Sequence, residues 1–98
     1  MVSKAVYKVP GGKLVKVELE QQRGQISRVK ITGDFFVHPE EALLQIEGSL
    51  RGCSLEENEI SRKIEMTVSE IGCQLVGFSA QDIAKAIVIA YESENLTN

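Results

Sequence analysis

The spacing of hydrophobic residues changes once along this chain, near residue 39. Before that point they recur at every second position, most clearly in the segment Lys13–Glu20. After it they recur at every third or fourth position, as Leu43, Ile46 and Leu50 do. Period two is typical of a strand with one buried face, and a period near 3.6 is typical of an amphipathic helix. The chain is therefore predicted to form strands first and helices afterwards.

Three runs carry the period-two pattern and are predicted as strands: Ala5–Val9, Lys13–Glu20 and Arg28–Thr32. The first two are separated by Pro10-Gly11-Gly12, a strong turn signal, and the last two by the polar segment Gln21–Gly24, read as a hairpin loop. Connections this short favour neighbouring antiparallel strands, so the three runs are predicted to form a meander.

Three helices are predicted in the rest of the chain. The first begins at Pro39-Glu40-Glu41, with proline and acids in its first turn, and stops at Gly52. The second begins with a capping box of Ser54 and Glu57 and ends at Gly72.

The third helix begins at Ser79 and Asp82, and Cys73–Phe78 is predicted as a short extended segment before it. Strands followed by helices indicate an α+β fold, with a three-stranded antiparallel meander and about three helices on one face. The 98 residues are enough for one domain, so residues 1–98 are treated as a single unit.

Composition narrows the classes of function. No apolar run approaches the roughly 18 residues that a membrane span needs, and the first residues lack a signal-peptide pattern, so a cytoplasmic protein is expected. Residues 1–33 carry a net charge of +5 and residues 34–98 a net charge of −8, which together give −3. Such a division can offer a basic surface to an anion, although simply solvated charged faces explain it better, because charged residues are normally exposed.

Residues that commonly perform chemistry are few and scattered. Cys53 and Cys73 do not form a CxxC pair, and with His38 as the single histidine no zinc ligand set is expected. Both cysteines are predicted to be small buried side chains rather than reactive thiols. No Ser/His/Asp set or paired catalytic carboxylates is evident, so no catalytic residue and no bound metal are predicted. A binding or accessory domain is favoured over an enzyme.

Two motifs are candidates for binding. The first is the turn Pro10-Gly11-Gly12, which Lys8 and Lys13 flank. It is not a Walker A loop, because Leu14 replaces the required Ser or Thr. Glycine amides without side chains can still approach an anion closely, and a plain turn between strands remains the alternative reading.

The second motif is Gly33-Asp34-Phe35-Phe36. Adjacent side chains on a strand point to opposite faces, so both phenylalanines cannot enter one core. One of them is therefore expected to be exposed, to cover a helix or to contact a partner.

Several strings together resemble a known family: Tyr7–Val15, Ile26–Ile31, Gly33–Glu41 and Leu50-Arg51-Gly52. They resemble the small C-terminal domain of lipoate–protein ligases, most closely the form in which that domain is a separate polypeptide, as in the two-subunit archaeal enzymes. The resemblance covers about half of the chain, roughly residues 7–52.

The resemblance implies an accessory subunit without an active site of its own. A large catalytic subunit would hold lipoate, ATP and Mg²⁺ and would form lipoyl-AMP before transfer to lipoyl-domain acceptor proteins. The turn of Lys8, Pro10, Gly11, Gly12 and Lys13 would face the ligase active site, and Asp34, Phe35 and Phe36 would contact the large subunit. The family's small domain is also similar in fold to iron–sulfur scaffold and sulfur-acceptor proteins.

Two other functions stay open at this stage. A sulfur-acceptor or iron–sulfur scaffold role would need an exposed thiol of low pKa at Cys53 or Cys73. A nucleic-acid module would use the basic hairpin, but a pI near 5.2 and the absence of a recognition motif speak against it. Neither nucleic acid nor membrane is expected as a partner.

Overall fold

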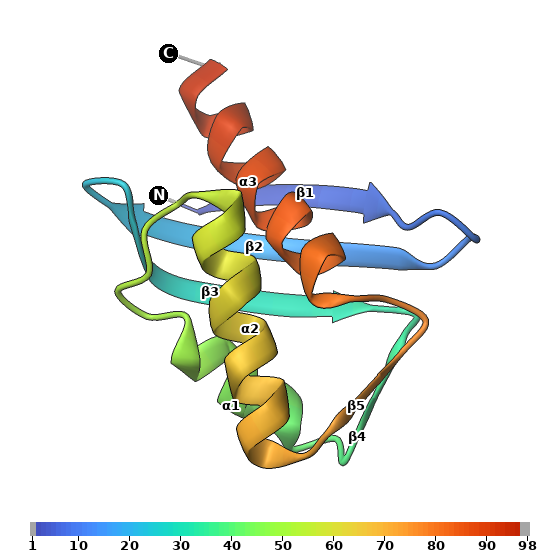
Figure 1. Cartoon of the computed structure of the whole chain (residues 1–98). Coiled ribbons are helices and arrows are strands. Elements are labelled where there is room, and N and C mark those ends of the chain that lie inside the picture. Colours follow the sequence, from blue (N-terminus) through green and yellow to red (C-terminus); the bar gives the residue numbers. More distant parts are fainter. Residues whose placement is uncertain (1, 97–98) are drawn as a thin grey trace.

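The computed structural model describes the backbone of residues 2–96 and the side chains of residues 2–93. The predicted meander is present: β1 (Ser3–Lys8), β2 (Leu14–Gln22) and β3 (Gln25–Gly33) form an antiparallel sheet in the order β1-β2-β3 (Figure 1). The central strand β2 directs Val15, Val17 and Leu19 into the core, each at most 1% exposed. The period-two pattern of the sequence thus marks the buried face of the sheet.

The hairpin between β2 and β3 is tighter than the sequence predicted. The strands continue to Gln22 and resume at Gln25, so the turn consists of Arg23 and Gly24 alone, with φ of 54° and 76°. A two-residue turn with positive φ at both residues matches the right-handed twist of the flanking strands. The predicted four-residue loop was therefore wrong in length.

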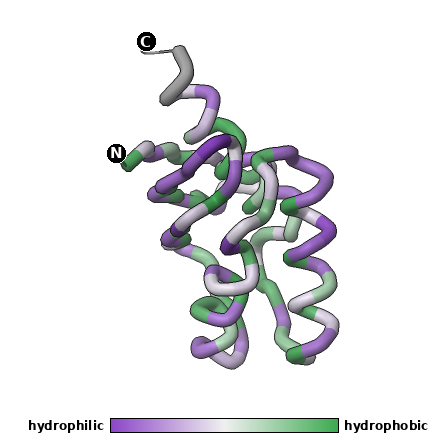
Figure 2. The backbone as a smooth tube through the Cα atoms, turned by 90° about the vertical axis from the view of Figure 1, so that its left-hand side faces the viewer, coloured by the Kyte–Doolittle hydropathy of each residue, from purple (hydrophilic) through white to green (hydrophobic). Residues whose placement is uncertain are grey.

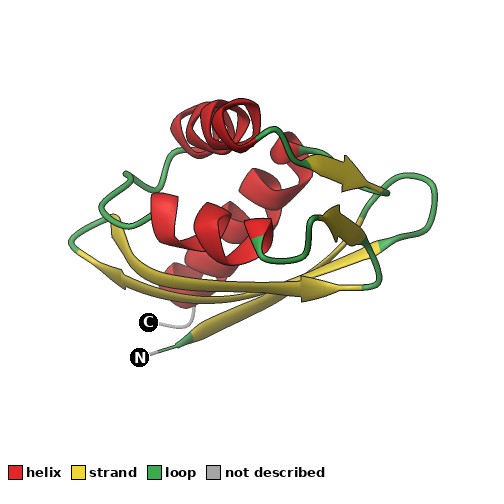
Figure 3. Ribbon diagram, turned by 90° about the horizontal axis from the view of Figure 1, so that it is seen from below, coloured by secondary structure: helices red, strands yellow, loops and turns green. Residues whose placement is uncertain are grey.

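All three helices lie on one side of the sheet, in two layers (Figure 3). Helix α1 (Ala42–Ser49) packs on β3, and α3 (Ala80–Leu96) packs on β1 and β2. Helix α2 (Glu57–Ile71) lies mainly on α1 and α3 instead of on the sheet. The α+β prediction is confirmed, and the second layer arises because α1 and α3 already cover the narrow sheet.

Helix starts were predicted with mixed success. Ser79 and Asp82 mark the start of α3 as predicted, and they form a capping box in which the Ser79 amide donates to Asp82 Oδ2 at 2.8 Å. The first helix begins at Ala42, so Glu40 and Glu41 precede it instead of occupying its first turn.

The predicted cap of α2 was wrong. Ser54 forms a bridge with Gln25 at the edge of β3, and its side chain caps no helix. The helix begins at Glu57, after an extended Glu56. Pairing with the sheet edge holds this segment extended, and that tertiary contact overrides the local capping preference. Gly72 ends α2 in the left-handed conformation, as predicted.

A second, two-stranded sheet joins distant parts of the chain. The predicted extended segment contains β5 (Gln74–Val76), and it pairs antiparallel with β4 (Phe36–His38), which the sequence had not predicted as a strand. Both strands lie beyond the end of β3 at which the main sheet stops (Figure 1). This ribbon places the segment after α2 beside the segment after β3.

Hydrophobic and hydrophilic positions alternate along the chain, and no long uniformly hydrophobic stretch is visible (Figure 2). Within residues 2–96, no helix combines the length and apolarity needed to cross a bilayer. The buried side chains form one cluster between the sheet and the helices.

One side chain of α1 binds a backbone amide on the outer edge of β3. Glu47 of α1 accepts a hydrogen bond from the backbone amide of Ile31, with 2.7 Å between Oε2 and nitrogen. We expect Glu47→Ala to lower the free energy of unfolding by about 1–3 kcal/mol, because it leaves that amide without an acceptor. Urea unfolding followed by circular dichroism measures the loss.

Glu47→Gln is the matched control, because its amide oxygen can still accept the bond. It should retain most of the stability. Equal losses in the two variants would show that the hydrogen bond to Ile31 is not what Glu47 contributes.

Candidate functional site

The turn between β1 and β2 projects at one end of the molecule (Figure 1). Two hydrogen bonds close it: the amide of Val9 donates to the carbonyl of Lys13 at 2.7 Å, and the amide of Gly12 donates to the carbonyl of Val9 at 3.0 Å. Gly11 and Gly12 both have φ of +108°, a backbone conformation that side chains disfavour. The turn therefore needs both glycines to present its backbone to solvent.

The second motif is attached to the base of this turn. Asp34 Oδ1 accepts a hydrogen bond from the Leu14 amide at 2.6 Å, and the Asp34 amide donates to the Leu14 carbonyl at 3.3 Å. Gly33 leaves no room for a side chain, since a Cβ there would collide with the Leu14 carbonyl oxygen. The structure thus brings together two motifs that the sequence separates by twenty residues.

The two phenylalanines point to different environments. The ring of Phe35 stacks on Phe78, with ring centroids 4.0 Å apart and an angle of 28° between the planes. Phe36 is 68% exposed on β4, and its register partner on β5, Val76, is 50% exposed. Phe36 is therefore the phenylalanine available to a partner, and Phe35 joins the chain's own segments.

A third segment completes this end of the molecule. The side chain of Lys13 lies across Gly77, where a Cβ would come within 3.1 Å of Lys13 Cγ. Gly77 has φ of +92° and stands between Val76 and Phe78. We call the combined surface the turn end, defined as residues 8–14, 33–37 and 76–78. Sequence reasoning missed the contribution of residues 76–78, because a single glycine after a strand gives no signal of what lies opposite it.

The turn end can attract an anion and has no described group placed for proton transfer. Lys8 and Lys13 are exposed, and the Asp34 carboxylate is engaged by the Leu14 amide. Exposed ammonium groups interact weakly with an anion in water, and more strongly when a second surface excludes the water. This geometry suits a surface that acts when it is pressed against another protein.

Comparison with protein families identifies the chain. Residues 5–87 match the model of a family described as the C-terminus of bacterial lipoate protein ligase. The chain belongs to this family. The match extends through α2 and into α3, well past the motifs that carried the resemblance in the sequence.

A curated relative comes from Thermoplasma acidophilum and is named lipoate-protein ligase A subunit 2. It is 40% identical over 50 residues, which make up 50% of this chain and 53% of the relative. The matched segment thus spans about half the length of that relative.

A solved structure supports the family assignment along nearly the whole fold. It belongs to a study of an archaeal lipoylation system of Thermoplasma acidophilum, described as a bi-partite lipoate protein ligase and its E2 lipoyl domain. The likeness has a TM-score of 0.75 with 28% identity, and it covers 89% of this chain and 94% of the other.

The two cysteines of this family member are poorly placed for thiol chemistry. Cys73 is buried, as predicted, and Cys53 is half-buried. Burial raises the pKa of the Cys53 thiol, the Glu59 carboxylate raises it further, and the Lys63 ammonium opposes both effects. Within the described residues, no group of three or more His, Cys, Asp or Glu side chains could hold a metal ion.

A raised pKa lowers the thiolate fraction at neutral pH, and the thiolate is the reactive form. We expect iodoacetamide to alkylate Cys53 at pH 7.5 more slowly than in the urea-unfolded chain, with Cys73 slower still. Mass spectrometry of timed samples, repeated with rising pH, measures both rates. A folded chain that reacts faster than the unfolded one would contradict this environment and revive a sulfur-acceptor role.

Proposed function

We propose that this chain is the non-catalytic accessory subunit of a lipoate–protein ligase, required by a larger catalytic subunit for the ATP-dependent activation of lipoate to lipoyl-AMP. The observation that supports it most strongly is the family match over residues 5–87. The relative named as a ligase subunit and the likeness to a chain of a bi-partite ligase point the same way. The two subunits would form a heterodimer in the cytoplasm and serve protein lipoylation.

The proposed contribution of this chain is electrostatic and steric. Forming an acyl-adenylate brings a carboxylate against a triphosphate, so positive charge and exclusion of water both favour the reaction. Lys8 and Lys13 would supply that charge from the turn end, and the turn of Pro10, Gly11 and Gly12 would close against the large subunit. Lipoate, ATP and Mg²⁺ would be held by the large subunit, and the lipoyl-domain acceptor would meet this chain only indirectly.

The proposed contact with the large subunit includes Phe36 and its neighbour Val76, both exposed on the ribbon of β4 and β5. Apolar side chains that stand in solvent beside a motif are typical anchors of an interface. Asp34 and Phe35 stay predicted members of this contact. Asp34 bonds to Leu14 and Phe35 stacks on Phe78, both within this chain, so these two residues would support the contact by holding the turn end in place.

The alternative role as a sulfur acceptor or iron–sulfur scaffold has no support in the environment of the thiols. The likeness of this fold to those proteins stays a prediction.

The direct test mixes this chain with the large ligase subunit, lipoate and Mg-ATP and follows the release of pyrophosphate. Release that requires both polypeptides is the expected result. Equal activity of the large subunit alone would reject the accessory role.

Lys13→Ala is expected to slow lipoate adenylation about tenfold or more while changing transfer from preformed lipoyl-AMP by less than about twofold. Positive charge near the triphosphate matters only in the first half-reaction. Single-turnover assays of the two half-reactions measure the difference. Lys30 is an exposed lysine in the middle of β3, so Lys30→Ala is the control for the loss of one positive charge. Equal losses in both half-reactions for Lys13→Ala would contradict the proposed position of Lys13.

Phe36→Ala is expected to weaken binding of the large subunit by about 2 kcal/mol or more, close to thirtyfold in Kd, because it removes an aromatic anchor. Calorimetric titration measures the affinity. Met66→Ala on α2 is the control, since Met66 is 51% exposed on a different face. An unchanged Kd for Phe36→Ala would remove the ribbon from the interface.

A further inference from the structure

The two outer edges of the three-stranded sheet are treated differently. The edge of β3 is closed by the chain itself: Glu47 accepts from the Ile31 amide, and the Ile26 backbone exchanges hydrogen bonds with Gly52 and Cys53 at 2.7 and 2.8 Å. An open edge is a template for pairing with another chain, and proteins commonly cover it in this way. The β3 edge is therefore covered by the chain's own segments at Ile26 and Ile31.

The edge of β1 is open. The bond from the Val9 amide to the Lys13 carbonyl fixes the alternation of the β1–β2 ladder, so Tyr7 and Ala5 direct their backbone groups toward β2. Lys4, Val6 and Lys8 direct their N–H and C=O groups away from the sheet. None of these three has a backbone hydrogen bond on that side to any residue that the structure describes.

Helix α3 provides cover beyond this edge. It crosses β2 and β1 and continues past β1 in both Figure 1 and Figure 2. Its 17 residues span about 25 Å at 1.5 Å per residue, whereas three strands about 4.8 Å apart make a sheet only about 10 Å wide. A strand added beside β1 would thus find a helix above its inner face.

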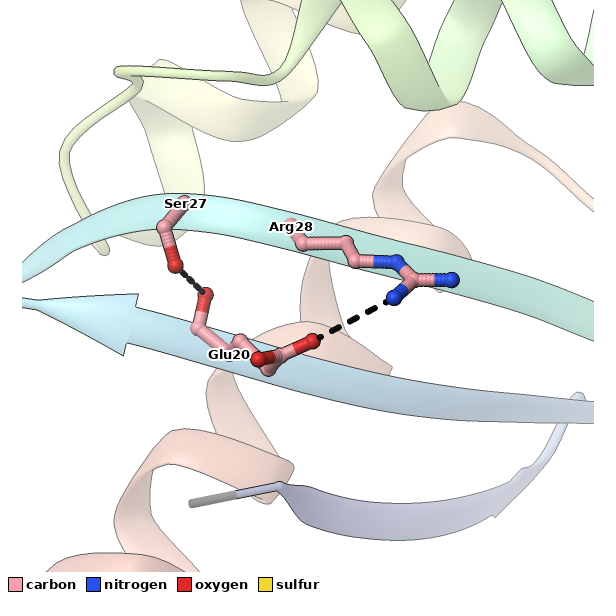
Figure 4. Close-up of polar contacts among 3 residues, drawn as sticks. All are labelled: Glu20, Ser27 and Arg28. Carbon is pink, nitrogen blue, oxygen red and sulfur yellow. Dashed lines mark hydrogen bonds and ion pairs between the residues drawn. The ribbon is translucent and has the colours of Figure 1, made fainter.

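The side chains on the outer face of β1 determine which kind of strand could pair with it. Lys4, Val6 and Lys8 point to this face, and Val6 is 60% exposed. The neighbouring outer face carries Lys16, Arg28 and Lys30 against Glu18 and Glu20, so its net charge is positive. Glu18 lies opposite Lys4, and Arg28 pairs with Glu20 at 3.7 Å (Figure 4). A second copy pairing antiparallel about Val6 would place Lys4 opposite Lys8 of that copy, and like charges directly opposite are destabilising.

We propose that β1 binds an extended segment of a protein partner as a fourth strand, with acidic residues opposite Lys4 and Lys8 and apolar residues on the inner face beside the half-buried Ala5 and Tyr7. Main-chain hydrogen bonds would supply affinity, and the alternation of acidic and apolar residues would supply specificity. The partner tested is the large ligase subunit, so that choice rests on the proposed function. The strand-binding property itself belongs to β1.

Amide hydrogen exchange, resolved by residue with NMR, tests the proposal in the complex with the large subunit. The amides of Lys4, Val6 and Lys8 should exchange about tenfold or more slowly in the complex than in the free chain. Those of Ala5 and Tyr7 are already bonded to β2 and should change much less. A complex that forms without slowing the three outward amides overturns the proposal and leaves the accessory function intact.

Two variants separate main-chain pairing from charge. Val6→Pro removes an outward N–H that the β1–β2 ladder does not use, and it should weaken the complex about tenfold or more, while Val6→Thr keeps the N–H and should bind normally. Lys4→Glu should also weaken binding, and Lys30→Glu, with the same charge change away from the edge, should not. Equal effects of Lys4→Glu and Lys30→Glu would reject the acidic strand.

If the large subunit does not bind at all, the proposed function fails and a second probe still decides the inference. A blocked peptide of about nine alternating glutamate and valine residues, titrated into the free chain, should shift and protect the same three amides. No shift at millimolar peptide would overturn the proposal. A shift that appears equally with an alternating lysine and valine peptide would reject the charge selection.

Discussion

One hydrophobic surface determines the architecture of this protein: the face of β2 that carries Val15, Val17 and Leu19. Burying a side chain of this kind stabilises the fold by about 1.5–3 kcal/mol, so this face has to be covered. Because neighbouring residues on a strand point to opposite sides, the other face of the same sheet is charged. All three helices therefore gather on one side, and the outer face of the meander is left to solvent.

The meander also determines where the binding motifs meet. In an antiparallel sheet of three strands, the turn after the first strand and the exit from the third strand lie at the same end. The Pro10-Gly11-Gly12 turn and the Asp34 motif are therefore neighbours by topology, and the bonds between Asp34 and Leu14 fix their spacing. Two motifs that look independent in the sequence form one surface.

The surfaces that remain free are consistent with a protein that works through partners. The turn end carries exposed cations, the ribbon of β4 and β5 carries the exposed Phe36, and β1 offers unpaired backbone groups. The chain covers the β3 edge at Ile31 with Glu47 and at Ile26 with residues 52–53, and it leaves the β1 edge open. Charged and hydrogen-bonding groups on these surfaces interact more strongly when water is excluded, which a second protein would do.

The sequence alone determined the features whose causes are local. Period-two and period-3.6 spacing predicted the three strands of the meander and the three helices, and Ser79 and Asp82 correctly marked the start of α3, because these signals act over a few residues. Contacts between distant segments determined the rest. Ser54 pairs with Gln25 at the sheet edge instead of capping α2. The ring of Phe35 stacks on Phe78, and Phe36 is left exposed. Local spacing does not encode which distant partner a side chain meets, so only the folded chain settles these positions.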